Sequence, residues 1–439
     1  MLTAESGEGL QKLASTLEQW CRDNALQINV SKTKVMVVAK QGMRPTAPTI
    51  TVCDQTVEVV HSYKYLGIQF HHDLSWKTHV DYVEKKVKVR LGQLSFLLSN
   101  KDLSVAVRLA IYRSLVLPLF TYAAGVWSVT DYQLQQLEIE HRCALKRILG
   151  TAITTTNAAV LNETGMVSVA TLLESCKLQF VGRLATVEKS RLVHKIFELE
   201  FSNHGILAEA HNLVYKFKLR EALVKLLEGH SLNWNDLVVQ HVKVFCQKYL
   251  KQQLLQAVKC SGLNINENLC TAWYLKLESK LASFLFKLRA GSLHLEVEKG
   301  RFKKLIREER ICPLCGTEVE DAYHFIMKCP CLAPERELLL HKFESLSSVE
   351  ESSCSGCVSS EHNDTIFSFL MEKSFGPKTE DESKCMHEVV QQLHLMWVKR
   401  CKLLHREICV SNPEILRTQS SVCFESMLPV QDHHILSHI

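Results

Sequence analysis

Three cysteines and one histidine between residues 312 and 329 have the types and the spacing of metal ligands. Cys312, Cys315, His324 and Cys329 form a C-x2-C-x8-H-x4-C pattern. Thiolates and imidazoles are ligands that zinc prefers, and a structural zinc site takes four ligands in tetrahedral geometry. The sequence therefore predicts a small knuckle organised by structural Zn²⁺. Cys331, two residues beyond the last ligand, is a rival for the place of Cys329.

A second pair of cysteines imitates half of such a site. Cys354 and Cys357 precede His362 in a stretch that is rich in Ser, Glu and Cys. Biased composition of this kind is typical of a linker without a packed core. We therefore expect no metal site there.

The composition is that of a globular protein. Hydrophobic residues make up 46% and charged residues 23% of the 439 residues, and the formal net charge is +5. No apolar stretch reaches the length of a membrane span, and the first residues lack a secretory signal. We therefore expect an intracellular protein of the nucleus or cytoplasm, with no membrane partner and with its 17 cysteines reduced. In so cysteine-rich a chain, four unrelated side chains are the alternative to the zinc site.

Apolar periodicity predicts the elements that position these residues. An amphipathic helix is expected at 6–24, capped by Ser6 and carrying one apolar stripe. The stripe consists of Leu10, Leu13, Leu17 and Trp20. Short strands are expected at 26–29, 35–38, 50–53, 57–60 and 63–68. Helical patterns follow at 77–99, 102–117, 130–149, 168–200, 205–300 and 385–407. The chain is therefore predicted to be α+β and mostly α.

The first 75 residues carry a motif that resembles a known family. Trp20, Asn24, Leu26, Asn29, Lys32 and Thr33 follow a W-x3-N-x-L-x2-N-x2-K-T pattern. This pattern resembles the fourth motif of reverse transcriptases from non-LTR (LINE-type) retrotransposons. Tyr65-Leu66-Gly67 resembles the primer-grip hairpin that follows it, and the segment from Tyr112 to Trp127 resembles the helical thumb. The knuckle matches the zinc-binding region near the end of the same reading frame, so the resemblance covers about residues 1–330.

The resemblance implies the C-terminal part of such an enzyme, with a small antiparallel β palm remnant followed by helices. The expected segments are a lower palm remnant with the primer-grip hairpin at 1–75, a helical thumb at 76–200, a helical linker region at 201–310, the CCHC zinc knuckle at 311–331, a Ser/Glu-rich linker and C-terminal helix at 332–407, and a disordered tail at 408–439.

The resemblance also implies substrate contacts in the palm remnant. It assigns Lys32 to the incoming triphosphate, where a lysine can neutralise developing charge or protonate the leaving pyrophosphate. The residues alone favour a surface lysine beside a strand turn. It assigns Tyr65, Leu66 and Gly67 to the primer strand, since glycine lets a backbone approach closely. An ordinary hairpin in a sheet is compatible with that role. The thumb segment from Tyr112 to Trp127 is expected to be packing core.

Around the knuckle, the resemblance implies contact with RNA and DNA. Zinc would organise the loop, and nearby cations would meet phosphates. These cations are Arg301, Lys303, Lys304, Arg307 and Lys328. Tyr323 and Phe325 flank His324, and each can either stack on a base or pack against the metal site.

The family's polymerase chemistry needs Mg²⁺ held by aspartates from two motifs. No x-Asp-Asp pair occurs in the 439 residues, so Mg²⁺ is expected only in the full-length family enzyme. We therefore expect a truncated reverse transcriptase domain that is inactive alone and retains nucleic-acid-binding parts. Its expected partners are RNA, DNA and the missing N-terminal polymerase and endonuclease parts. The alternative is a non-enzymatic, zinc-dependent protein that binds nucleic acid or other proteins.

Overall fold

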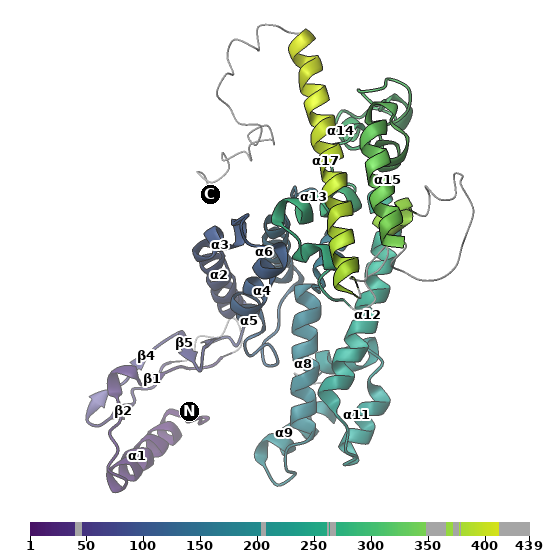
Figure 1. Ribbon diagram of the computed structural model, residues 1–439. Coiled ribbons are helices and arrows are strands. Elements are labelled where there is room, and N and C mark those ends of the chain that lie inside the picture. Colours follow the sequence, from purple (N-terminus) through teal and green to yellow (C-terminus); the bar gives the residue numbers. More distant parts are fainter. Residues whose placement is uncertain are drawn as a thin grey trace. The chain divides into compact units, whose positions relative to one another are not determined.

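The chain forms two compact units (Figure 1). The computed structural model describes residues 1–39, 46–202, 208–260, 269–347, 366–371 and 379–411, together with residues 263 and 377. Over these residues, the first unit comprises Met1–Gln256 and Ile265–Thr271, and the second comprises Ala257–Asn264 and Ala272–Ile439. No helix in the described ranges is long and apolar enough to cross a membrane.

The described strands all lie in the first unit and are short. They are β1 (Lys34–Val35), β2 (Thr51–Val52), β3 (Gln55–Thr56), β4 (Glu58–Val59), β5 (Ser62–Tyr65) and β6 (Ile68–His71). β2 pairs with β3 and β5 pairs with β6, and both hairpins are antiparallel as expected. β1 instead pairs with β4 in parallel, with Lys34 opposite Glu58. The predicted mostly α fold with a few short strands is confirmed.

The strand expected at 26–29 does not form. The side chain of Asn29 accepts a hydrogen bond from the backbone N–H of Lys32 at 3.0 Å, and this bond caps the 3₁₀ turn η1 (Val30–Lys32). Asparagine side chains compete with regular backbone pairing in this way. The motif residues 29–33 therefore form a capped turn that leads into β1.

Helix α1 (Gly7–Asp23) begins as predicted, because the side chain of Ser6 accepts a backbone hydrogen bond in the first turn. Only part of the expected stripe faces the core, since Leu10 packs against it and Leu17 and Trp20 do not. Ala14 is buried in a small core with the strands, whereas Trp20 is 54% exposed and Leu17 37% exposed. The expected packing through Trp20 and Leu17 is therefore wrong. A small side chain lets the helix approach two-residue strands closely, and the bulky residues lie on a neighbouring face.

Helices form the rest of the first unit. They are α2 (Lys77–Gln93), α3 (Ser95–Ser99), α4 (Val105–Leu115), α5 (Leu117–Thr121), α6 (Asp131–Leu149), α7 (Asn157–Thr164), α8 (Val169–Ala185), α9 (Leu192–Ser202), α10 (Ala208–Lys216), α11 (Arg220–Leu227) and α12 (Trp234–Gln256). Gly150 ends α6 at φ +65°, in the left-handed conformation typical of a C-cap. Helix α7 had no counterpart among the predictions, and the helix expected at 168–200 is two helices.

The second unit carries the knuckle. Its elements are η2 (Val258–Cys260), η3 (Trp273–Lys276), α13 (Ser279–Arg289), α14 (Glu296–Phe302), η4 (Arg307–Glu309), η5 (His324–Lys328), η6 (Pro330–Leu332), α15 (Ala333–Ser347) and α17 (Glu380–Ser411). Helices α15 and α17 pack against each other. In α17, Val389 and Leu393 are buried and Trp397 is half-buried, as its periodicity predicted.

Parts of the expected domain scheme lie outside the described residues. These parts include Cys354, Cys357 and His362, and the tail at 408–439 except where α17 continues to Ser411. The six-segment division stays a prediction.

A glycine fixes the packing of α8 against α12 in the first unit. Trp234 is buried at the start of α12, and its indole N–H donates to the carbonyl of Leu178 at 2.7 Å. A Cβ added to Gly182 would lie 1.9 Å from the Trp234 ring. The two helices can therefore approach each other only because residue 182 has no side chain.

We predict that Gly182→Ala destabilises the first unit by about 1–3 kcal/mol, because the added methyl overpacks the core. Gly92→Ala in α2 is the matched control, since a Cβ there meets nothing within 4 Å. An alanine in an exposed helix position should instead stabilise by roughly 0.5–1 kcal/mol. Urea unfolding followed by tryptophan fluorescence and helical circular dichroism measures both. Equal stability of Gly182→Ala and the wild type would contradict the packing described above.

Candidate metal centre and its surroundings

A tight backbone turn presents the first two cysteines. A single antiparallel bridge joins Ile311 to Val319, and the N–H of Cys312 donates to the carbonyl of Glu318 at 2.8 Å. The N–H of Gly316 then donates back to the carbonyl of Cys312 at 2.9 Å. Gly316 has φ +68°, a conformation that glycine adopts without strain. The segment C-P-L-C-G therefore folds into a knuckle on local backbone bonds.

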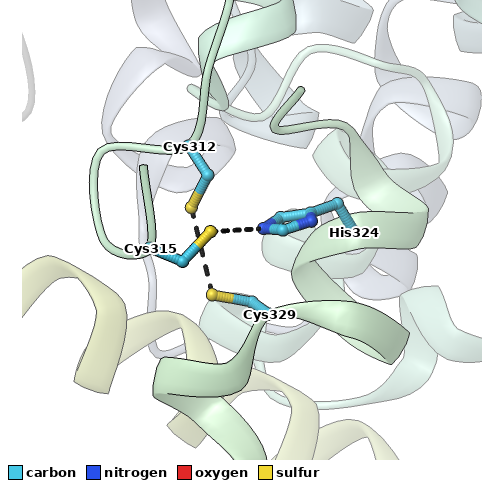
Figure 2. A group of neighbouring side chains, drawn as sticks. All are labelled: Cys312, Cys315, His324 and Cys329. Carbon is cyan, nitrogen blue, oxygen red and sulfur yellow. Dashed lines mark hydrogen bonds between the residues drawn. The ribbon is translucent and has the colours of Figure 1, made fainter. Parts of the chain in front are cut away.

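A π-helical turn presents the other two residues. In η5, the N–H of Cys329 donates to the carbonyl of His324 at 2.8 Å, five residues back. The carboxylate of Asp321 accepts the backbone N–H of His324 at 2.9 Å and caps the turn. Such i→i+5 turns are rare and are frequent at functional sites. The wide turn brings both side chains toward the cysteine pair (Figure 2).

The four predicted ligand residues converge on one point (Figure 2). Their ligand atoms all lie within 4.8 Å of one another. The sulfurs of Cys312 and Cys329 are 3.9 Å apart, and the sulfur of Cys315 is 3.4 Å from Nε2 of His324. A tetrahedral site with Zn–S bonds of about 2.3 Å places two sulfurs roughly 3.8 Å apart. The described residues therefore contain a Cys3His cluster with the dimensions of a tetrahedral metal site.

Cys331 does not belong to the cluster. Its side chain is exposed, and its sulfur donates to the carbonyl of Leu314 at 3.2 Å. Cys329 is 1% exposed and faces Cys312. The geometry favours Cys329 over Cys331 as the fourth member.

The thiols of the cluster differ in acidity. Burial raises the pKa of both Cys312 and Cys329. Burial also opposes ionisation at Cys315, but hydrogen bonds from Thr317, from the backbone of Glu318 and from Cys312 together outweigh it and lower the pKa of that thiol to about 6. A metal binds thiolates, so metal binding would ionise all three cysteines of the cluster.

A carboxylate lies behind the histidine. Glu318 is 3.5 Å from Nδ1 of His324, and Lys328 lies 3.5 Å from the same carboxylate. The bond with His324 first, and the charge of Lys328 next, hold the pKa of Glu318 below its usual range. A carboxylate in this position fixes the ring tautomer and leaves Nε2 facing the cluster, as in many histidine–metal sites.

Three of the five cations predicted to bind nucleic acid are paired with carboxylates. The pairs are Arg301–Glu298 at 3.1 Å, Arg307–Asp321 at 2.7 Å and Lys328–Glu318 at 3.5 Å. Each cation is at least 40% exposed, so these are surface pairs of small energetic weight. They partly neutralise the positive charge that the sequence suggested.

Lys303 and Lys304 are the two predicted cations that form no ion pair with a described carboxylate. Both are exposed, and no described carboxylate lies within salt-bridge distance of either. Phe302 beside them is 66% exposed and Ile306 is 61% exposed. The guanidinium of Arg310 donates to the carbonyl of Leu305 at 2.6 Å and braces this loop. Sequence reasoning missed Phe302, although an aromatic residue next to two lysines is a recognisable signal.

The aromatic residues beside His324 pack inside the second unit. Phe325 is 1% exposed, and its ring meets that of Trp397 edge to face at 5.9 Å. Tyr323 is half-buried and contacts the ring of Phe367 at 5.1 Å. Of the two expected roles, packing near the cluster is the one that these contacts support.

The predicted primer-grip residues form the tip of the β5–β6 hairpin. Leu66 and Gly67 have φ +48° and +85°, the positive values of a tight two-residue turn. The hydroxyl of Tyr122 donates to the carbonyl of Leu66 at 2.8 Å, and a Cβ on Gly67 would lie 2.8 Å from the Tyr122 ring. Residue 67 must therefore be glycine, because the ring of Tyr122 lies too close to the backbone for a side chain to fit. Tyr65 precedes the turn and is 39% exposed.

Lys32 lies near the base of the same hairpin. The hydroxyl of Tyr63 in β5 donates to the carbonyl of Lys32 at 2.9 Å, and the lysine side chain is exposed. Tyr112 and Trp127 are buried as expected for packing core, while Tyr122 is 56% exposed. Its contact with the hairpin gives Tyr122 a role that sequence periodicity does not reveal.

No protein-family model matches the chain. The chain is similar to the RNA-directed DNA polymerase from mobile element jockey of Drosophila melanogaster, 24% identical over 144 residues, which are 32% of this chain and 16% of that protein. It is also similar to a probable RNA-directed DNA polymerase from transposon BS of Drosophila melanogaster, 26% identical over 126 residues, 28% of this chain and 14% of that protein. A longer alignment, 22% identical over 340 residues, covers 74% of this chain and 29% of a putative 115 kDa protein in type-1 retrotransposable element R1DM of Drosophila melanogaster.

The matched segments span less than a third of the length of each of these proteins. The sequence identities are low, but the three similar proteins are of one kind, since each is from a mobile element. Over the matched parts, the chain resembles the RNA-directed DNA polymerases of non-LTR retrotransposons, as its motifs predicted.

Proposed function

We propose that this chain is a zinc-organised nucleic-acid-binding part of a retrotransposon reverse transcriptase. The observation that carries the proposal is the largely buried Cys3His cluster, with an exposed basic loop six to ten residues before Cys312, in a chain similar to RNA-directed DNA polymerases. RNA and DNA are the proposed partners, and the nucleus or cytoplasm is the proposed location. The N-terminal polymerase and endonuclease parts of such a reverse transcriptase are further proposed partners.

Zinc is the metal that best fits the cluster. Three thiolates and an imidazole are a donor set that Zn²⁺ takes in closed structural sites. The proposed ligands are Cys312, Cys315, Nε2 of His324 and Cys329, and all but Cys315 are buried. Four protein ligands leave no open position for water, so the ion would stabilise the fold and would not catalyse.

We predict that the purified chain binds one zinc ion and that Cys312→Ser loses it. Cys331→Ser is the matched control, because Cys331 lies outside the cluster. That variant should retain the wild-type stoichiometry. Metal analysis after gel filtration measures all three proteins. Unchanged zinc in Cys312→Ser, or loss of zinc in Cys331→Ser, would refute the proposed ligand set.

The loop from Phe302 to Ile306 is the proposed nucleic-acid surface of the second unit. Lys303 and Lys304 can meet phosphates without first breaking an ion pair to a described carboxylate. Phe302 offers a ring on which an unpaired base can stack. Arg301, Arg307 and Lys328 are proposed as secondary contacts, since each already has a carboxylate partner. In the first unit, Lys32 and the tip Tyr65-Leu66-Gly67 remain proposed contacts with triphosphate and primer.

We predict that replacing Lys303 and Lys304 together by alanine weakens binding to single-stranded DNA and RNA. Each lost phosphate contact should reduce the magnitude of the slope of log K against log salt by about 0.7 for single strands. Lys276→Ala is the control, because Lys276 is an exposed lysine elsewhere in the same unit. Fluorescence anisotropy over a salt series gives both the affinity and the slope. An unchanged slope in the double variant would place the phosphate contacts elsewhere.

We also propose that the chain alone does not polymerise DNA. Polymerases of this class hold two Mg²⁺ ions with carboxylates from separate motifs. No adjacent aspartate pair occurs in the sequence. In the described part of the chain, the Cys3His cluster is the one group of three or more metal-binding side chains that lie close together.

We predict no primer extension by the purified chain on an RNA template with Mg²⁺ or Mn²⁺. An active reverse transcriptase in parallel reactions shows that template and primer are competent. A gel-shift with the same template and primer should show binding, because the binding parts do not depend on the aspartates. Template-dependent synthesis that survives rigorous purification would disprove this proposal and would leave the zinc proposal intact.

A further inference from the structure

A buried ion pair lies against the metal cluster in the second unit. Glu320 is 1% exposed and Arg400 is 2% exposed. Two guanidinium nitrogens of Arg400 donate to the two carboxylate oxygens of Glu320, each at 2.6 Å. The two residues are 80 positions apart in the sequence. Arg400 belongs to α17, so this pair ties that helix to the segment that carries the knuckle.

The carboxylate of Glu320 lies next to a proposed metal ligand. Its Oε1 is 3.8 Å from the sulfur of Cys312, which is 1% exposed. Its Oε2 also accepts the backbone N–H of Glu296 at 2.9 Å. Once Cys312 is a metal-bound thiolate, two negative groups would lie side by side among buried residues. A bare carboxylate there would oppose thiolate formation, and a cation is needed to offset it.

Arg400 has the position and the rigidity to supply that charge. Its guanidinium stacks over the ring of Trp397 at 4.9 Å from the centroid. Trp397 in turn meets Phe325, the residue after His324, edge to face at 5.9 Å. The cation is therefore held from its own helix and cannot turn away to solvent. A Cys3His site around Zn²⁺ carries one net negative charge, which also favours a fixed cation nearby.

We propose that Arg400 is a positioning residue for the metal site: its guanidinium neutralises Glu320 beside the Cys312 thiolate, so that metal binding and the docking of α17 stabilise each other. The inference rests on the zinc site proposed above. Outer groups that orient metal ligands typically change metal affinity by about 10- to 100-fold when they are removed. Linkage is reciprocal, so whatever docked α17 adds to zinc affinity, zinc adds to the docking of α17.

Zinc affinity of single variants, measured by competition with a chromogenic chelator, tests the charge role. Arg400→Met should weaken zinc binding about 10- to 100-fold, because it leaves Glu320 unneutralised. Glu320→Gln should bind zinc at least as tightly as the wild type, because the opposing charge is gone. Lys399→Met is the matched control, since Lys399 is 47% exposed and pairs with Glu335, which is not a member of the cluster. Wild-type affinity in Arg400→Met, or an equal loss in both variants of the pair, would overturn the inference.

The double variant Glu320→Gln/Arg400→Met guards against a simple folding defect. It removes both charges, so its zinc affinity should return to within a few-fold of the wild type even if Arg400→Met alone misfolds. A loss as large as in Arg400→Met would mean that the pair is merely structural, and the inference would fail. Absence of zinc from the wild-type chain would instead refute the metal site itself, and the two failures are thereby distinguished.

Limited proteolysis of the wild-type chain tests the reciprocal side. Removing zinc with a chelator should speed cleavage within α17, and adding zinc back should restore protection. In Glu320→Gln/Arg400→Met, the ion pair between α17 and the knuckle is absent. The protection of α17 from cleavage should therefore depend less on zinc. Equal cleavage of α17 with and without zinc in the wild type would overturn the coupling.

Discussion

A short stretch of backbone pairing holds the second unit's functional features in place. Cys312 donates its N–H to Glu318, and Glu320 donates its N–H to Arg310 at 3.0 Å. These two bonds position a proposed metal ligand, a buried carboxylate and the arginine that braces the basic loop. Because each neighbouring feature uses a different residue of the same pairing, distortion there would disturb all of them together.

The cluster could be predicted from the sequence because its geometry is local. Four ligands within 18 residues need only a turn with a glycine at φ +68° and one wide helical turn. Spacing alone could not decide between Cys329 and Cys331, since both lie within reach along the chain. The direction of each side chain, set by the bond from Cys329 to His324, makes the choice. The partner of Glu320 was unpredictable, because 80 residues separate it from Arg400.

In the fold, too, features that neighbouring residues determine could be predicted, and features that distant contacts determine could not. The cap at Ser6 and the period of α17 follow from neighbouring residues, and both were predicted correctly. The packing face of α1 depends on what lies opposite, and a helix with apolar residues on two sides cannot reveal which side will be covered. The contact of Tyr122 with the hairpin tip is likewise tertiary, joining residues 56 positions apart. Periodicity places such a residue on a helix and says nothing of its distant neighbour.

The wide turn at His324–Lys328 constrains the number of residues between His324 and Cys329 far more strictly than it constrains their types. Substitutions between His324 and Cys329 leave the backbone bond between those residues intact as long as the new side chains fit the core. Adding or deleting a residue there would rotate one of the two side chains away from the other, whatever its type. Between Cys315 and His324, the backbone bonds of Glu318 and Glu320 fix the chain as well, and the turn at Gly316 and Thr317 is the exposed part. Insertions and deletions among relatives should therefore spare the interval between His324 and Cys329.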